Sequence, residues 1–461
     1  MKPSPAPPSA PTLSPARMQQ VKAEIHRQIV SVIDLSGLTG WSSDRLRQEV
    51  QALAVKLSRG LPEKLRDAER DSLVGEVMAE VFGLGPLEQL MKDPTISDIL
   101  VNGPQLVYVE RLGRLEPTGV TFKDNSHLTQ VIQRIASQVG RRIDESMPMV
   151  DARLPDGSRV NAILPPLSLD GPMLSIRRFG VRLGEGQLLA NGTLTSEMIC
   201  LLEAAVSSRI NILISGGTGS GKTTLLNVLS AYIPTDERLV SIEDAAELSL
   251  RQPHVVRLET RLPNLEGAGA VSQRDLVRNS LRMRPDRIIV GEVRGPEALD
   301  MLQAMNTGHE GSLTTVHAND TRDALSRLEM MVTMAGFEVP LPVIRKYVSS
   351  ALTLLVHVNR MKGGARKVSR ITELVGLKGG KRYVVRDLFE FRQTGIEDGQ
   401  AVGTFHATGH VPTFLERLYS YGIDLPSELF TQRQLTTPLP VGSSGSMASI
   451  DVLLLRRFRR S

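Results

Sequence analysis

A glycine-rich stretch at residues 216–223 carries the clearest chemistry in the chain. It reads Gly-Gly-Thr-Gly-Ser-Gly-Lys-Thr and satisfies the pattern G-x-x-x-x-G-K-[ST] at every fixed position. The apolar run 210–214 predicts a strand before it, and a helix is predicted to follow, so backbone N–H groups and a helix N-terminus would surround a phosphate. Lys222 would reach the β- and γ-phosphates, and the Thr223 hydroxyl would bind Mg²⁺. The predicted nucleotide-binding residues are Gly216, Gly217, Thr218, Gly219, Ser220, Gly221, Lys222, Thr223 and Thr224.

Two further apolar strands end in carboxylates that suit the same phosphate site. Residues 287–292 read Arg-Ile-Ile-Val-Gly-Glu and place Glu292 at a strand's carboxyl end, where α/β sheets bind ligands. Gly291 stands where many phosphate-loop proteins have Asp, so we expect Glu292 to act on the metal through bound water. Glu243 ends the other strand, and a carboxylate there can orient and deprotonate an attacking water.

Hydroxyl and imidazole groups follow in the segment 307–319. His317 lies between Thr315 and Asn319 and is the better candidate for sensing a γ-phosphate, whereas His309 is the weaker one. A lone histidine in such a segment is more often structural.

Arginines gather before the phosphate loop, and phosphoryl transfer needs positive charge near the γ-phosphate. Most of them should form surface ion pairs. Arg153 and Arg159 flank a Leu-Pro-Asp-Gly-Ser turn, and a tight hairpin would present both guanidinium groups rigidly.

The elements that would position these residues form successive blocks. A change from helical to β-like apolar spacing, and then to alternating strand and helix signals, separates the folded blocks. We also interpret residues 180–192 as an interdomain linker. The predicted blocks are a disordered Pro-rich leader (1–16), a helical N-terminal domain (17–92), an α+β domain (93–181), an α/β domain with a mostly parallel sheet (182–432) and a flexible tail (433–461).

Composition limits the class of protein. A chain of 461 residues with 41% hydrophobic residues suggests two to four domains, and its net charge of +5 does not demand a nucleic-acid partner. The single cysteine, Cys200, excludes an intramolecular disulfide and a cysteine-rich zinc site. Since no apolar run reaches the roughly 18 residues of a membrane span, we expect a cytoplasmic protein whose membrane contact is peripheral and through partners.

Four motifs together resemble a known family. GGTGSGKTT, SIEDAAEL, RPDRIIVGEVRG and TGHEGSLTTVHAND resemble the Walker A, Asp box, Walker B and His box of type II/IV secretion ATPases. ISDILVNGP, GRRIDESMPMVDARLPDGSRVNAILPP, LSIRRF and FHATGHVPTFLERLYSYGIDLP resemble the Tad/Flp pilus assembly branch, the CpaF-like ATPases. The resemblance covers roughly residues 75–430.

The resemblance implies a RecA-like P-loop ATPase domain preceded by an α+β, PAS-like domain and a small helical domain. It implies a homohexamer at the inner face of the bacterial inner membrane that uses ATP and Mg²⁺ to power pilus assembly on TadB/TadC-like platform proteins. Glu243 would then be the catalytic carboxylate, Glu292 the Walker B carboxylate and His317 the sensor. Arg153, Arg159 or Arg177 would supply charge to the γ-phosphate from a mobile domain.

Two other functions stay open at this point. A DNA-handling or conjugation-type RecA-like motor is disfavoured because aromatic residues make up only 4% of the chain and no basic stripe is interleaved with them. We therefore expect no nucleic-acid partner. A non-catalytic nucleotide switch is disfavoured because both acidic candidates, Glu243 and Glu292, are present. Extension against retraction of the pilus is undecided.

Overall fold

The computed structural model describes residues 15–32, 43–62, 65–111, 113–178, 183–261, 263, 268–336 and 338–436. The chain divides into two compact units, 1–181 and 182–461, which are treated separately below. Among the helices of the described residues, none is both long and apolar enough to span a bilayer. Residues 1–14 of the predicted leader and most of the predicted tail lie outside the described residues, whereas residues 15 and 16, assigned to the leader from the sequence, already belong to the first helix.

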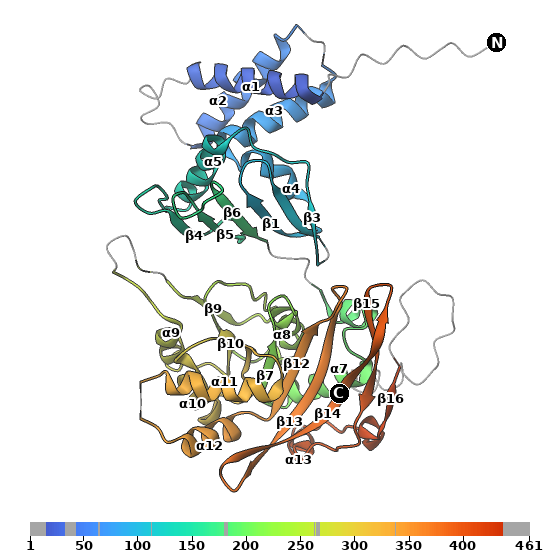
Figure 1. Ribbon diagram of the computed structural model, residues 1–461. Coiled ribbons are helices and arrows are strands. Elements are labelled where there is room, and N and C mark those ends of the chain that lie inside the picture. Colours follow the sequence, from blue (N-terminus) through green and yellow to red (C-terminus); the bar gives the residue numbers. More distant parts are fainter. Residues whose placement is uncertain are drawn as a thin grey trace, which may run out of the picture. The chain divides into compact units, whose positions relative to one another are not determined.

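The first unit begins with three helices, followed by a sheet with one long helix (Figure 1). Val21, Ile25 and Ile29 are buried among the three helices, as their spacing of four residues predicts. The elements are α1 (Pro15–Val32), α2 (Ser43–Arg59), α3 (Asp67–Phe82), η2 (Gly85–Leu87), α4 (Glu88–Lys92), β1 (Ile96–Asn102), β2 (Val107–Arg111), β3 (Arg114–Pro117), α5 (Asn125–Gln138), β4 (Met149–Arg153), β5 (Arg159–Ile163) and β6 (Met173–Arg177).

The sheet of this unit is antiparallel, with the strand order β3-β2-β1-β6-β5-β4. Alternate residues such as Val160 and Ile176 are buried together with Leu128 and Ile132 of α5. One face of the sheet therefore forms the core with α5, and the intervening residues point to the other face.

Helix α3 is joined to α1 and α5 by a buried ionic cluster. Glu80 lies 2.8 Å from Lys22 Nζ, and its other oxygen lies 3.0 Å from His127 Nε2. Burial alone would raise the pKa of Glu80, but the hydrogen bonds with His127 and Lys22 lower it to about 2. Because the pKa in the folded state is lower than the ordinary value of about 4.3, the ionised carboxylate stabilises the fold above that value.

We expect this stabilisation to be lost as the pH falls from about 5 to about 2, with a total near 3 kcal/mol. Scanning calorimetry of the full chain should show that Glu80→Gln destabilises strongly at pH 6 and much less at pH 3. The control is Glu76→Gln, because Glu76 is 3.7 Å from Lys22 but 43% exposed. Equal effects of Glu80→Gln at both pH values would contradict the assignment.

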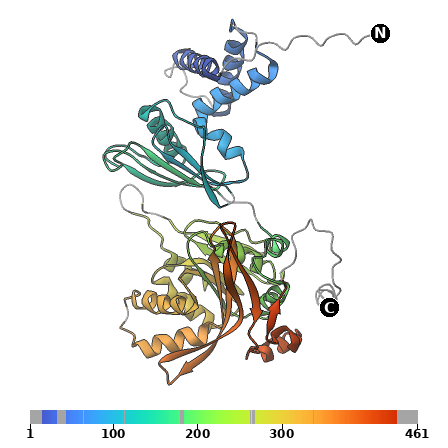
Figure 2. The ribbon, with the colours of Figure 1, turned by 45° about the vertical axis from the view of Figure 1, so that its right-hand side comes forward.

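The second unit contains a ten-stranded sheet with helices on both faces (Figures 1 and 2). The elements are α6 (Glu185–Ala190), α7 (Ser196–Ser207), β7 (Ile212–Gly216), α8 (Lys222–Ser230), β8 (Leu239–Glu243), β9 (Val255–Glu259), α9 (Gln273–Ser280), β10 (Arg287–Val293), α10 (Glu297–Asn306), β11 (Leu313–His317), α11 (Thr321–Thr333), α12 (Leu341–Ala351), β12 (Leu354–Arg360), β13 (Arg366–Lys378), β14 (Arg382–Glu397), β15 (Gln400–Ala407), α13 (Leu415–Ser420), η3 (Ser427–Phe430) and β16 (Arg433–Leu435).

The parallel part of this sheet has the order β12-β7-β11-β10-β8-β9. Strand β7 is buried along its whole length, since Ile212 and Ile214 pack into one core and Leu213 into the core on the other face. The phosphate-loop strand β7 lies between β12 and β11, and β10 and β8 follow beyond β11. This is the strand order of a RecA-like domain. The predicted α/β class is confirmed.

Three details differ from the sequence prediction. From Arg366 onward the strands are antiparallel rather than parallel, because tight turns such as Asp398-Gly399, both at positive φ, can only join hairpins. Within the supposed linker, residues 185–190 form helix α6, whose Leu188 is buried in the core. Residues 433–435, expected to begin the tail, form β16, which pairs with β15.

Candidate nucleotide site

The phosphate loop connects β7 directly to α8 and is shaped by its glycines. Gly219 and Gly221 have φ values of 66° and 99°, a region that favours glycine. A β-carbon on Gly216 would lie 2.3 Å from the Val358 carbonyl oxygen and 2.6 Å from Ser220 Oγ. The loop therefore has room for glycine alone at position 216. Helix α8 begins six residues later, at Lys222.

Lys222 connects the loop to the neighbouring strand. Its Nζ donates to the carbonyl oxygens of Gly216 at 3.1 Å and Gly217 at 3.0 Å, and lies 3.2 Å from Nε2 of His317. His317 ends β11 and pairs with Gly216, so strand register alone brings it to the loop. The same Nε2 lies 2.8 Å from Oε1 of Glu292. The structure thus brings Lys222, His317 and Glu292 together.

The protonation of His317 decides which of these two contacts is a hydrogen bond. One ring nitrogen can accept from Lys222 when it carries no proton, or donate to Glu292 when it does. Burial lowers the pKa of His317; Glu292 raises it in part, and the charges of Lys222 and Arg294 lower it further. The neutral imidazole, which accepts from Lys222, is therefore favoured at neutral pH.

Glu292 is placed by an irregularity in β10. The pairing with β11 passes from Val290 opposite Thr314 to Val293 opposite Val316, so β10 has an extra residue at this point. Such a bulge redirects the side chains next to it. The other oxygen of Glu292 accepts from Arg294 at 2.5 Å.

There is little room for a side chain at position 291, which explains the glycine there and which the sequence alone does not reveal. A β-carbon there would lie 2.9 Å from Cγ of Glu243, which comes from the neighbouring strand β8. Oε1 of Glu243 accepts from the N–H groups of Glu247 and Leu248, both at 2.8 Å, whereas its Oε2 is buried and has no hydrogen-bond partner among the described residues. Burial raises the pKa of Glu243, although these two N–H groups lower it in part. A buried carboxylate with one uncommitted oxygen suits a general base.

Arg294 was not singled out in the sequence analysis, although it lies two residues after Glu292. It donates to Glu292 and its other terminal nitrogen is 3.7 Å from Asp244. Arg294 therefore links the ends of β10 and β8. The signal for it was its place two residues after Glu292, inside the segment RPDRIIVGEVRG.

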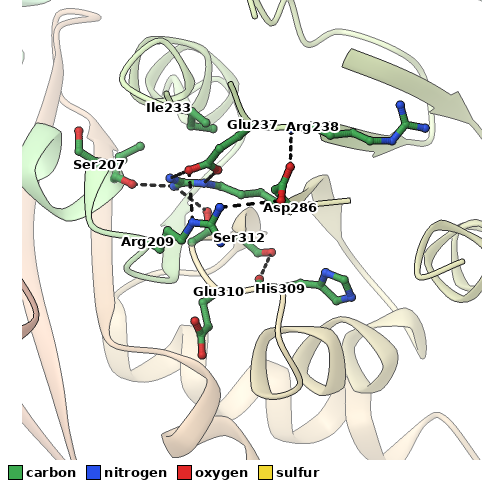
Figure 3. A network of polar contacts seen from close by, with 12 residues as sticks. Ser207, Arg209, Ile233, Glu237, Arg238, Asp286, His309, Glu310 and Ser312 are labelled. Carbon is green, nitrogen blue, oxygen red and sulfur yellow. Dashed lines mark hydrogen bonds and ion pairs between the residues drawn. The ribbon is translucent and has the colours of Figure 1, made fainter. Parts of the chain in front are cut away.

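His309 lies at the opposite edge of the sheet, before β11 begins. Its Nδ1 donates to the carbonyl oxygen of Pro285 at 3.1 Å, so its role in the fold is structural. Figure 3 shows the polar network next to it, in which the Ser312 hydroxyl donates to the His309 carbonyl and Arg209 lies near Glu237 and Asp286.

The centre of this network is a fully buried ion pair. Arg287 is 0% exposed and bonds both oxygens of Glu237, at 2.5 and 2.9 Å. It also donates to the Val206 carbonyl at 2.6 Å. Gly311 is required beside it, since a β-carbon there would lie 2.7 Å from Arg287.

We expect Arg287→Met to destabilise the second unit by about 3–5 kcal/mol, because it leaves Glu237 buried without its bidentate partner. Arg370→Met is a matched control, since Arg370 pairs with Asp387 at 2.7 Å but is 49% exposed, and it should cost under about 1 kcal/mol. Urea unfolding followed by circular dichroism compares the two. Adding Glu237→Leu to Arg287→Met should recover most of the loss; similar costs for both single variants would contradict this interpretation.

The three arginines proposed to stabilise charge lie in one row of the first unit's sheet. Arg153 is opposite Arg159, and Arg159 is opposite Arg177. Arg177 also lies 3.8 Å from Asp98. Because directly opposite residues share a face, the three side chains emerge on the same side of the sheet. They belong to the other unit, so their part in the nucleotide site stays a prediction.

The residues of the second unit fit ATP with Mg²⁺. The glycine-rich loop and the N-terminus of α8 suit a polyphosphate, and Thr223 follows Lys222 in the first turn of α8. Glu292 and Lys222 both contact His317, so the carboxylate lies close to the lysine. Thr223 and Glu292 would hold the metal, the latter through water. When bound, Mg²⁺ would neutralise charge on the phosphate oxygens.

The model of the family described as "Type II/IV secretion system protein" matches residues 80–377, more than half of the chain. This protein belongs to the type II/IV secretion system protein family. Three relatives show its breadth. A Mycobacterium tuberculosis protein that carries a provisional conjugal-transfer name is 38% identical over 322 residues, covering 68% of this chain and 91% of the relative. The conjugal transfer protein TrbB of Rhizobium radiobacter is 35% identical, covering 62% and 86%. The type IV secretion system protein VirB11 of Brucella suis is 33% identical, covering 63% and 89%.

Solved structures of similar proteins exist as well. The VirB11 ATPase of the Brucella suis type IV secretion system, in complex with sulphate, is 31% identical with a TM-score of 0.34, covering 64% of this chain and 97% of that one. The pilus retraction motor PilT with bound ADP is 20% identical with a TM-score of 0.44, covering 64% and 83%.

Proposed function

We propose that this protein is an ATPase that works as a homohexamer at the inner face of the bacterial inner membrane and powers assembly of a Tad/Flp-type type IV pilus. The observation that carries the proposal is the contact of Lys222 and Glu292 with the same ring nitrogen of His317. A phosphate-binding lysine and a carboxylate thus meet where three parallel strands end. Membership of the secretion family supports coupling of the reaction to transport.

The chemistry proposed for the site assigns one task to each side chain. Lys222 and the loop N–H groups bind the phosphates. Glu243, held by two backbone N–H groups, accepts the proton of the attacking water at its uncommitted oxygen. Glu292 orients metal-bound water, and His317 responds to whether Lys222 is engaged by a phosphate. Arg153, Arg159 or Arg177 would add positive charge to the γ-phosphate oxygens.

The pilus branch rests on sequence segments that resemble Tad/Flp ATPases, such as residues 140–166 and 405–426. On this proposal the partners are TadB/TadC-like platform proteins of the inner membrane. A conjugation-type motor is the second candidate, because names of two of the relatives refer to conjugal transfer.

One experiment in the native bacterium separates the two functions. The native gene is replaced by the Glu292→Gln allele, and surface pili and plasmid transfer are both counted. Loss of pili with normal plasmid transfer is the expected result. Loss of transfer with normal pili would overturn the pilus proposal in favour of conjugation. An Arg370→Ala allele is the control, because Arg370 pairs with Asp387 of β14.

A further inference from the structure

We propose that Arg360 and Arg366, at the turn end of the β12–β13 hairpin, belong to the nucleotide site. Arg360 would contact the diphosphate part of the nucleotide, and Arg366 would position the phosphate loop. The inference rests on the proposed ATPase function and deepens it. Neither arginine belongs to a motif that the sequence analysis identified.

The topology places this hairpin directly beside the phosphate loop. Gly216, where the loop leaves the sheet, pairs with His317 of β11 on one side and with Val358 of β12 on the other. Strand β12 then continues beyond the end of β7 to Arg360, which lies opposite Arg366 of β13. The loop is therefore flanked by His317 on one side and by the two arginines on the other.

Short distances connect both side chains to the loop. Nε of Arg366 donates to the carbonyl oxygen of Gly219 at 3.3 Å, and its terminal nitrogen donates to the Gly364 carbonyl at 2.9 Å. A β-carbon on Gly219 would lie 3.4 Å from a terminal nitrogen of Arg360, and one on Gly221 would lie 3.8 Å from Cγ of Arg366. Two guanidinium-bearing side chains thus lie against the phosphate loop at Gly219 and Gly221.

The two opposed arginines beside the phosphate loop are suited to binding an anion. Two guanidinium groups directly opposite each other attract a phosphate that lies beside them. The planar guanidinium also matches two phosphate oxygens at once. Since Glu292 and His317 occupy the flank that serves the γ-phosphate and metal, the opposite flank faces the α- and β-phosphates. Arg360 should therefore bind ADP and ATP equally well.

Calorimetric titration of the full-length chain with ADP and with ATP tests this, using a Glu292→Gln parent so that ATP is not consumed. Arg360→Ala should raise both dissociation constants by the same factor, about 10- to 100-fold, as expected for one charge-assisted hydrogen bond. Arg360→Lys should lose less of the affinity for the two nucleotides. Arg366→Ala should also weaken both ligands, and Arg366→Lys, which keeps a donor for the Gly219 carbonyl, should recover part of the affinity.

Arg370→Ala is the matched control, because it removes an arginine from the same strand that pairs with Asp387 instead. Its dissociation constants should stay within about twofold of the parent's. The inference is overturned if Arg360→Ala leaves ADP binding unchanged, or weakens ATP alone, while the parent binds both nucleotides. A parent that binds neither nucleotide would instead overturn the proposed function along with it.

Discussion

Glu292→Gln should lower ATP turnover by about 10²- to 10⁴-fold and leave ATP binding intact. The amide keeps the shape of the side chain but loses the negative charge that faces His317 at 2.8 Å and Arg294 at 2.5 Å. Steady-state phosphate release measures the turnover, and calorimetric titration measures the binding.

The matched control for this variant is Glu390→Gln, which removes a carboxylate paired with Arg392 on β14, away from the strand ends that meet the phosphate loop. It should leave turnover unchanged. If Glu292→Gln turned over ATP within about threefold of the wild type, a nucleotide switch that does not depend on hydrolysis would become the better account.

Glu243→Gln should lower ATP turnover by a similar factor. It should also change how kcat/KM depends on pH. The amide oxygen can still accept from the N–H groups of Glu247 and Leu248, so the loop after β8 should keep its shape. A general base works only when ionised, and burial raises the pKa of Glu243. Wild-type kcat/KM should therefore be full above that raised pKa and fall as the pH drops through it, beginning above the value of about 4.3 of an exposed glutamate.

The residual activity of Glu243→Gln should lack this acid limb, because the group that titrates has been removed. Measuring kcat/KM from pH 5 to 8 for both proteins separates the two carboxylates. If the acid limb persisted in Glu243→Gln and vanished in Glu292→Gln, the base would be Glu292 instead.

Local sequence was enough to predict the parts of the site that are local in the chain. The strand and helix that flank the phosphate loop, and the positions of Glu243, Glu292 and His317 at or near strand ends, could be predicted because each motif contains its own strand or turn signal. The helices of the first unit were predicted for the same reason, since their apolar residues recur every three or four positions.

What the sequence did not reveal depends on which strands are neighbours. Gly291 is explained only by Glu243 across the β10–β8 pairing, and Arg360 reaches the phosphate loop only because β12 pairs with β7. The glycines of residues 180–192 predict a linker, whereas the burial of Leu188 that stabilises α6 within this segment is a tertiary contact. The Asp398-Gly399 pair is itself a hairpin signal in the sequence, and both residues have positive φ in the structure.

The central claim is that Lys222 holds the phosphates of a nucleotide that this chain then cleaves. Its most direct test is phosphate release by the purified full-length protein with ATP, with and without Mg²⁺, beside the Lys222→Ala variant. We predict Mg²⁺-dependent release by the wild type and none above background by Lys222→Ala. A wild type that neither binds ATP nor releases phosphate, or a Lys222→Ala variant as active as the wild type, would contradict the account.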